Sequence, residues 1–186
     1  MRAAFWVIVG LGAIPWVIPS GGARRIVARH PQVIFIRLLE TTTVFLYVLV
    51  AQVLERRLAL LGPENAVAGW AGVAITLAEV ALTTWAKVVL RGSFSLSLGI
   101  REGHELITAG PYSRMRHPIY TGILVAMAGA ALVFDSGAVL LCLAAPFGVF
   151  FYWQTVVEEK LLEAHFGAAY VEYRQRAGRF LPRVNA

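Results

Sequence analysis

The 186-residue sequence contains little charge and a single cysteine. Asp, Glu, Lys and Arg together make up 15% of the residues. Cys142 has no cysteine or histidine nearby at ligand spacing, so neither a disulfide framework nor a thiolate metal site is expected. The sequence also lacks a G-x-G-x-x-G turn, a P-loop, a G-x-S-x-G elbow and an H-E-x-x-H pair. Soluble nucleotide-binding and common hydrolase chemistry are therefore not indicated.

Long apolar runs dominate the sequence. Hydrophobic residues make up 58% of it and the mean hydropathy is +0.66, which is too apolar for an ordinary soluble domain. We expect residues 1–186 to form one all-α integral membrane domain with about five transmembrane helices. The apolar segments that predict these helices are Ala3–Ile18, Val33–Leu54, Val67–Leu90, Ile119–Phe134 and Gly137–Val157.

The basic residues predict an orientation in the membrane. The net charge is +6, but the basic side chains cluster at the ends of apolar segments, which favours membrane topology over nucleic-acid binding. Arg24, Arg25 and Arg29 follow the first segment directly, so we expect this segment to be retained with its carboxyl end in the cytoplasm. Five spans then place the amino terminus outside and the tail after Val157 inside. The predicted location is the cytoplasmic membrane, crossed several times.

The two last apolar segments are separated only by the short turn at 135–137, which predicts an antiparallel helical hairpin. Such a hairpin brings His117-Pro118, at the start of one helix, beside Val157-Glu158 in the other. The polar stretches 91–117 and 158–186 would meet the same membrane face. We therefore expect a pocket at the cytoplasmic face, closed by a loop and the carboxyl-terminal tail.

Several side chains at this face are candidates for binding. Glu158 and Glu159 lie at the carboxyl end of a helix, where the helix dipole disfavours anions, so at least one should serve a cation. That cation is either a protein arginine or a ligand ammonium. His117 is a general base, a metal ligand, or a cap or ligand contact, and the lack of a second ligand at suitable spacing disfavours metal. Tyr112 and Tyr120 are either membrane-interface residues or rings that hold a sulfonium or ammonium by cation–π attraction.

Two blocks of sequence resemble the isoprenylcysteine carboxyl methyltransferase family. The first runs from Glu102 to Gly122 and contains Arg116-His117-Pro118, and the second runs from Glu158 to Arg174 and is followed by Leu181-Pro182. Both blocks occur in the family's order at a fitting spacing. The resemblance covers roughly the carboxyl-terminal half, whereas the first three spans match only in hydropathy and number.

The resemblance implies an integral membrane methyltransferase that uses S-adenosylmethionine. Residues 1–90 would supply three spans and residues 91–186 would bind the cofactor, with Glu158 taking the ammonium of its methionine part. The implied reaction is direct displacement, in which the acceptor attacks the methyl carbon in a closed, water-poor pocket. By position, the resemblance assigns cofactor contacts to Ser97, His104, Glu105, Leu106, Ile107, Tyr112, His117, Pro118, Ile119, Tyr120 and Glu158.

One residue departs from the family pattern. Where the eukaryotic enzymes place an arginine that meets the substrate carboxylate, this sequence has Gln154, a neutral amide. Either Arg116, Arg174 or Arg176 substitutes for that arginine, or the acceptor is not a prenylcysteine carboxylate. We predict the carboxylate of an isoprenylcysteine-type compound as acceptor. In this prediction Arg116 and Arg176 are catalytic, and Gln154 and Arg174 bind substrate.

Three alternatives remain open at this point. The first is a membrane thiol or amine (phospholipid) methyltransferase. The second is an NADPH-dependent sterol-type reductase, which a phosphate-binding cluster at Arg174, Arg176 and Arg179 would favour. The third is a non-catalytic membrane protein. The expected partners are a lipid-like or prenylated small molecule and membrane lipid, with no metal, no nucleic acid and no obligate protein partner.

Overall fold

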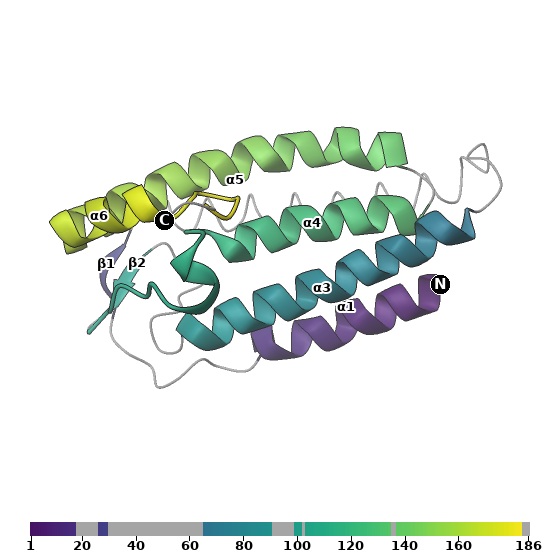
Figure 1. Cartoon of the computed structure of the whole chain (residues 1–186), viewed down its shortest axis with the longest axis horizontal. Coiled ribbons are helices and arrows are strands. Elements are labelled where there is room, and N and C mark those ends of the chain that lie inside the picture. Colours follow the sequence, from purple (N-terminus) through teal and green to yellow (C-terminus); the bar gives the residue numbers. More distant parts are fainter. Residues whose placement is uncertain (18–25, 30–64, 91–98, 102, 135–136, 184–186) are drawn as a thin grey trace.

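A computed structural model describes residues 1–17, 26–29, 65–90, 99–101, 103–134 and 137–183. The long helices of the described residues run along the long axis of the molecule (Figure 1). The elements, in chain order, are α1 (Arg2–Val17), β1 (Ile26–Arg29), α3 (Ala66–Leu90), β2 (Gly99–Arg101), the 3₁₀ helix η2 (Gly110–Ser113), α4 (Pro118–Val133), α5 (Gly137–Phe166) and α6 (Ala168–Arg176).

The predicted apolar segments correspond closely to helices. Three of them match α1, α3 and α4 to within one or two residues at each end. The fifth begins as predicted at Gly137, but α5 continues past Val157 to Phe166. The second, Val33–Leu54, lies outside the described residues. Helices dominate as predicted, and the structure adds a short antiparallel pair of strands, β1 and β2.

Local sequence signals explain where the helices begin and end. The side chain of Asn65 accepts a hydrogen bond from the backbone N–H of Ala68 (3.1 Å), which satisfies a free donor in the first turn of α3. Pro118 occupies the first position of α4, where its missing N–H costs no hydrogen bond. Gly167 separates α5 from α6 with a φ of +56°, a conformation that favours glycine.

Small residues allow α3 and α4 to pack closely. The glycines show how close the helices lie. A Cβ atom on Gly72 would lie 2.5 Å from the Gly129 carbonyl oxygen, and a Cβ atom on Gly129 would lie 2.6 Å from Thr76 Oγ1. The buried Thr76 hydroxyl donates to the Gly72 carbonyl within its own helix (2.9 Å), so it needs no partner elsewhere. Close approach through small residues is a common way for helices to pack inside membranes.

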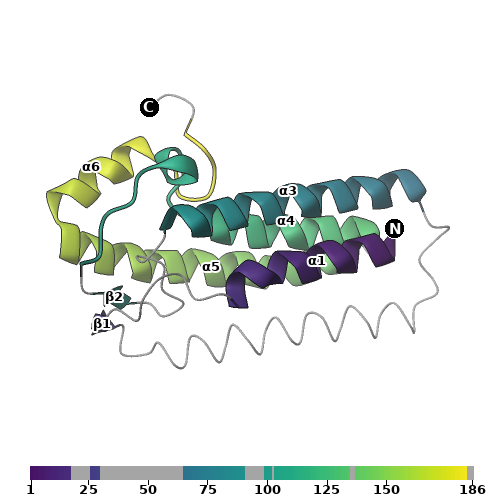
Figure 2. The same ribbon diagram turned by 90° about the horizontal axis from the view of Figure 1, so that it is seen from below.

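Apolar clusters connect the helices along their length. Phe5 of α1, Val73 of α3 and Val133 of α4 share one cluster. A second cluster joins α4 to α5 through Met127 and Phe151, and the two helices lie side by side in both views (Figures 1 and 2). Among the described residues, the helical core therefore consists of α1, α3, α4 and α5.

The outer helix faces carry large apolar side chains. Trp70, Leu77 and Trp85 of α3 are each more than half exposed, as is Leu11 of α1. Among the described residues, α3 is the one helix long and apolar enough to span a bilayer, and α1 and α4 contain shorter apolar helices. This exposed apolar surface is the kind that lipid covers.

Candidate functional site

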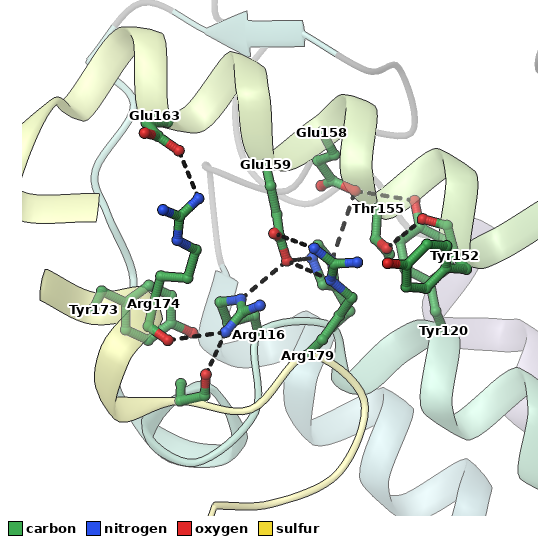
Figure 3. Close-up of polar contacts among 12 residues, drawn as sticks. Arg116, Tyr120, Tyr152, Thr155, Glu158, Glu159, Glu163, Tyr173, Arg174 and Arg179 are labelled. Carbon is green, nitrogen blue, oxygen red and sulfur yellow. Dashed lines mark hydrogen bonds and ion pairs between the residues drawn. The ribbon is translucent and has the colours of Figure 1, made fainter. Parts of the chain in front are cut away.

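The candidate site lies where the start of α4, the end of α5 and the carboxyl-terminal tail meet (Figure 3). Backbone hydrogen bonds join the tail to the loop before α4: Arg116 N–H donates to the Gly178 carbonyl (2.7 Å), and His117 N–H donates to the Arg179 carbonyl (3.0 Å). The hydroxyl of Thr121, in the first turn of α4, donates to the Phe180 carbonyl (2.8 Å). These bonds hold the tail against the loop.

Glu159 is the centre of the charge network. Its side chain is 5% exposed and accepts hydrogen bonds from three cationic or potentially cationic groups. Arg116 Nε donates at 3.0 Å, and Arg179 donates through Nε and Nη2 at 3.0 and 2.8 Å in a bidentate pair. His117 Nε2 lies 3.1 Å from the same carboxylate. Glu159 therefore connects α5 to both the loop and the tail.

This network keeps Glu159 ionised. Burial by itself would raise the pKa of the carboxyl, but hydrogen bonds from the histidine and the two arginines lower the pKa well below its ordinary value. The same pairing raises the pKa of the Arg179 guanidinium. Arg179 also lies over the ring of Tyr152, with its guanidinium carbon 4.8 Å from the ring centroid.

Arg116 makes further contacts that fix its position. Its Nη1 donates to the backbone carbonyl of Arg174 (3.1 Å) and to that of Ala177. With Glu159 as its ion-pair partner, the guanidinium ties the end of α6 to α5. Arg116 thus lies in the network around Glu159, and its guanidinium bonds to protein groups.

Glu158 has different surroundings from its neighbour. Its side chain is 33% exposed. The Tyr120 hydroxyl donates to Oε2 at 3.2 Å, and His117 Nδ1 lies 3.8 Å from the same oxygen, beyond hydrogen-bond distance. The structure thus brings Glu158, His117 and Tyr120 together, and Glu158 has no arginine or lysine ion pair among the described residues.

Gln154 lies one helical turn before Glu158 and is fully buried. Its Nε2 donates to the Tyr120 hydroxyl at 2.8 Å, which extends the chain of bonds from Gln154 through Tyr120 to Glu158. Its Oε1 is buried without a hydrogen-bond partner. A buried carbonyl oxygen without a donor costs about 1–3 kcal/mol, so this atom is suited to accept a hydrogen bond from a ligand.

Tyr112, in η2, helps to hold the loop of the site against α6. It is buried, and burial raises the pKa of its phenol, so the group stays neutral. Its backbone carbonyl accepts a hydrogen bond from the Tyr173 hydroxyl of α6 (2.8 Å). Leu106 packs on the cluster that Tyr170 and Tyr173 form with Ala177. These contacts join the segment before η2 to α6.

The remaining predicted cofactor contacts lie in the loop before α4 and in the first turn of α4, apart from Ser97. Pro118 is buried at the start of α4, and Ile107 and Ile119 are partly buried. The His104 ring lies 5.7 Å from that of Phe166, between centroids, and Glu105 is exposed. Ser97 lies outside the described residues.

Two predicted arginines do not join the carboxylates of the site. Arg174 Nη1 bonds to Glu163 at 2.8 Å. Arg176 pairs with Glu172 at 3.3 Å, and both of these side chains are more than 60% exposed. In the described part of the chain, neither guanidinium pairs with Gln154, Glu158 or Glu159. Of the three candidate bases, Arg116 is the one within the network.

The central roles of Glu159 and Arg179 were not predicted from the sequence. The expectation that Glu158 or Glu159 needs a cation rested on their lying at a helix end, and that premise is wrong, because α5 continues to Phe166. Glu159 is paired with arginines because its carboxylate is buried. The sequence offered no signal that selected Arg179, which is twenty residues further along the chain. Within the described ranges, no group of three or more His, Cys, Asp or Glu side chains is arranged to hold a metal ion.

The geometry defines a class: a helical fold with an apolar outer surface, whose site is built by a loop, the helix α5 and the tail and contains one paired and one partly exposed carboxylate. Comparison with known proteins then identifies the family. The model of the family described as "Phospholipid methyltransferase" matches residues 67–169, more than half of the chain. The chain belongs to this family.

Individual relatives agree with the resemblance to isoprenylcysteine methyltransferases. The chain is 35% identical over 113 residues to protein-S-isoprenylcysteine O-methyltransferase B of Arabidopsis thaliana, covering 60% of this chain and 57% of that protein. It is 31% identical over 90 residues to isoenzyme A of the same plant (48% and 46%). It is also 32% identical over 91 residues to the cobalt-zinc-cadmium resistance protein CzcN of Cupriavidus metallidurans (49% and 42%). The chain spans about half the length of these curated relatives.

Proposed function

We propose that the protein transfers a methyl group from S-adenosylmethionine to a lipid-like acceptor at a membrane surface. The observation that carries the proposal is the contrast between the two carboxylates. Glu159 is buried and neutralised by two arginines, whereas Glu158 is one-third exposed with only neutral or weakly basic groups beside it. A carboxylate in such a position is suited to a ligand cation. The family and the names of the relatives support the same activity.

The residues present fit the proposed cofactor. Glu158 would hold the ammonium of the methionine part, and the Tyr120 hydroxyl keeps the carboxylate oriented for it. The ring of Tyr120 offers a face that attracts a sulfonium. When bound, S-adenosylmethionine supplies an electrophilic methyl group. The loop and the tail, held together by Glu159, would exclude water from the reacting atoms.

The reaction requires few proton transfers from the protein. As the acceptor atom forms its bond to the methyl carbon, the carbon–sulfur bond breaks and its electron pair goes to sulfur. A carboxylate acceptor needs no general base. The chain's contribution is then to align the two molecules and to desolvate the attacking atom.

For the acceptor group, we propose the carboxylate of an isoprenylcysteine-type compound, as the sequence predicts. The names of two relatives, both protein-S-isoprenylcysteine O-methyltransferases, support it. One observation favours the second candidate, an amine or thiol: Gln154 Oε1 is a buried acceptor without a donor, and N–H groups satisfy such an atom whereas a carboxylate does not. The membrane orientation predicted above, with the site facing the cytoplasm, is part of the proposal.

The reductase alternative is less well supported. A phosphate-binding cluster at Arg174, Arg176 and Arg179 would favour the reductase. In the structure, each of these guanidiniums pairs with a glutamate. The test is binding by the detergent-solubilised full chain, measured by calorimetry with S-adenosylmethionine and, separately, with NADPH. We expect S-adenosylmethionine to bind and NADPH not to. Binding of NADPH alone would support the reductase, and binding of neither would overturn the proposed function.

A further inference from the structure

The arginines of residues 103–183 differ in their partners. Four of them form ion pairs with glutamates, namely Arg116, Arg174, Arg176 and Arg179. The other two, Arg114 and Arg183, are exposed, and neither pairs with an acid in the part of the chain that the structure describes. These two guanidiniums therefore carry positive charge that no described acid neutralises.

The loop and the tail bring Arg114 and Arg183 together. The backbone N–H of Arg183 donates to the Arg114 carbonyl at 3.0 Å, and that of Gly178 donates to the same oxygen at 3.0 Å. The guanidinium of Arg183 also donates to the Gln175 carbonyl, near the end of α6. The two arginines thus lie side by side, on segments that backbone hydrogen bonds hold in place.

A leucine is exposed in the same turn of the tail. A Cβ atom on Gly178 would clash with the Leu181 carbonyl, so the chain turns back tightly between these two residues. The Leu181 side chain is 76% exposed. One exposed leucine needs no explanation by itself. Here it is two residues from Arg183, so an apolar side chain and two unpaired cations occur at one place in the fold.

An exposed tryptophan marks the depth of this loop. Trp85 of α3 is 55% exposed, and its Nε1 lies 3.4 Å from the place of a Cβ atom on Gly110, the first residue of η2. Both views place η2, the tail and the end of α3 at the same end of the bundle (Figures 1 and 2). Tryptophan is enriched where a membrane meets water. Arg114 follows η2 directly, so we place it at the level of the lipid head groups.

We propose that Arg114, Leu181 and Arg183 form a docking surface for anionic phospholipid of the surrounding bilayer. The two guanidiniums would bind lipid phosphates, and Leu181 would enter the upper part of the acyl chains. Charge complementarity selects this occupant, because guanidinium groups bind phosphate through charge-assisted hydrogen bonds and basic residues are attracted to an anionic leaflet. The exposed leucine favours lipid over a soluble anion, which would leave this side chain in water.

Docking would act on the tail that covers the candidate site. The Arg179 carbonyl accepts a hydrogen bond from the His117 backbone N–H at 3.0 Å. Leu181 and Arg183 follow on the same segment of the tail. Lipid bound there would hold the tail against the loop from outside the network around Glu159. The docking surface needs no cofactor, so it can fail while the proposed function stands.

Lipid selectivity in detergent provides the first test. Native mass spectrometry of the full chain counts the phospholipid molecules that it binds, with phosphatidylglycerol and phosphatidylcholine of the same acyl chains as probes. We expect the wild type to prefer phosphatidylglycerol. Because one basic residue near an anionic surface changes the affinity about fivefold, Arg114→Gln should lower phosphatidylglycerol binding by about that factor and leave phosphatidylcholine binding unchanged.

Lys160→Gln is the matched control, because Lys160 of α5 is likewise exposed and forms no ion pair with a described acid. The change removes the same charge and should keep the preference for phosphatidylglycerol. An equal loss in Arg114→Gln and Lys160→Gln would show that net charge alone attracts the lipid, and would overturn the proposal. Displacement of phosphatidylglycerol by inorganic phosphate at equal concentration would also overturn it, because the site would then bind soluble anions.

The position of Leu181 provides a second test. In the full chain carrying Cys142→Ala, which removes the single native cysteine, a spin label on Leu181→Cys reports contact either with oxygen, which concentrates in the bilayer, or with a water-soluble nickel complex. In nanodiscs that contain phosphatidylglycerol, we expect the label at residue 181 to meet mainly oxygen. Ala169→Cys, at an exposed position of α6, is the control and should meet the nickel complex. A label at residue 181 that stays in water would overturn the proposal, whereas binding of S-adenosylmethionine by the same protein tests the proposed function separately.

Discussion

Glu158 and Glu159 are adjacent in sequence but have opposite surroundings. The side chain of Glu159 points into a network of two arginines and one histidine, and that of Glu158 meets a tyrosine hydroxyl and is one-third exposed. Because successive residues on a helix point about 100° apart, one turn of α5 can supply both a structural anion and a ligand-binding anion. Substitutions at the two positions should therefore have different consequences.

Glu158→Gln should weaken the binding of S-adenosylmethionine at least 30-fold. Removing one partner of a desolvated charge pair costs on the order of 2–5 kcal/mol. Calorimetry on the purified variant measures the loss. Glu163→Gln is the matched control, since Glu163 lies further along the same helix in an exposed pair with Arg174; an equal loss in both variants would place the ammonium elsewhere.

Arg179→Gln should destabilise the protein by about 1–3 kcal/mol near neutral pH, because it removes charged hydrogen bonds from a buried carboxylate. Thermal denaturation in detergent, followed by circular dichroism, provides the measurement. Arg176→Gln is the control, and its exposed pair with Glu172 should contribute less than about 1 kcal/mol. Similar unfolding temperatures for wild type and Arg179→Gln would contradict the central role of the pair.

The same network should make the fold acid-sensitive. The pKa of Glu159 is lower in the folded protein than in the unfolded chain, so its stabilising effect is fully present above the ordinary carboxyl value of about 4.3 and is lost as the pH falls below it. The difference in stability between wild type and Arg179→Gln should narrow as the pH falls through that range. A difference that stays constant down to about pH 3 would show that Arg179 acts through other contacts.

Gln154→Arg should shift acceptor preference toward carboxylates. A guanidinium at this position supplies a charge-assisted bond to a carboxylate, whereas with a neutral amine or thiol it would remain a buried, unpaired cation. Transfer of a labelled methyl group to a prenylcysteine analogue and to amine and thiol analogues of the same length measures the ratio. We expect the ratio of carboxylate to amine methylation to rise, and a fall would mean that residue 154 does not face the acceptor.

For individual helices, hydropathy predicted the apolar stretches well and missed the polar continuation of α5. The apolar run Val67–Leu90 coincides with α3 to within one residue, because a membrane helix needs an uninterrupted apolar stretch. The same criterion ended the last helix at Val157, although α5 continues to Phe166. Backbone hydrogen bonds continue a helix past the point where apolar side chains end, so hydropathy marks the end of the apolar stretch and not the end of the helix.

The site was predictable to the extent that it depends on two consecutive helices lying side by side. His117, Tyr120 and Glu158 could be grouped because a short turn between the last two apolar segments aligns their ends. The pairing of Glu159 with Arg179 depends on how the tail folds back over the loop, through backbone bonds such as that from His117 to Arg179. Such long-range contacts leave no periodic signal in the sequence.

The contact between α3 and α4 should depend on glycine. Gly129→Ala would place a methyl group 2.6 Å from Thr76 Oγ1 and 3.0 Å from the Gly72 carbonyl, so the helices must separate, at a cost of about 1–3 kcal/mol. Gly148→Ala in α5 is the matched control, because no atom lies within 4 Å of the added Cβ and alanine favours the helix by about 0.5–1 kcal/mol. Thermal denaturation should show opposite shifts, and equal shifts would mean that α3 and α4 are not closely packed.

At the scale of the whole molecule, the site lies at one end of a long helical bundle. Figures 1 and 2 place the start of α1 at one end of the long axis, and α6 and the tail at the other. If the axis crosses the membrane, the two ends of the described chain lie on opposite sides. This arrangement agrees with an odd number of crossings.

The direction of that crossing follows from charge. Arg24, Arg25 and Arg29 after the first apolar segment, and the basic tail, predict a cytoplasmic site and carboxyl terminus with the amino terminus outside. Fusions that place a reporter before Met1 or after Ala186 test this: a reporter active only in the cytoplasm should work at Ala186 and fail at Met1, and one active only outside should do the reverse. Neutralising the basic cluster is the matched perturbation. The double change Arg24→Gln, Arg25→Gln should weaken the preference for this orientation while leaving the network at Glu159 intact. A cytoplasmic signal at Met1 with none at Ala186 would invert the topology and place the site on the outer face, away from the cytoplasmic supply of S-adenosylmethionine that the proposed function requires.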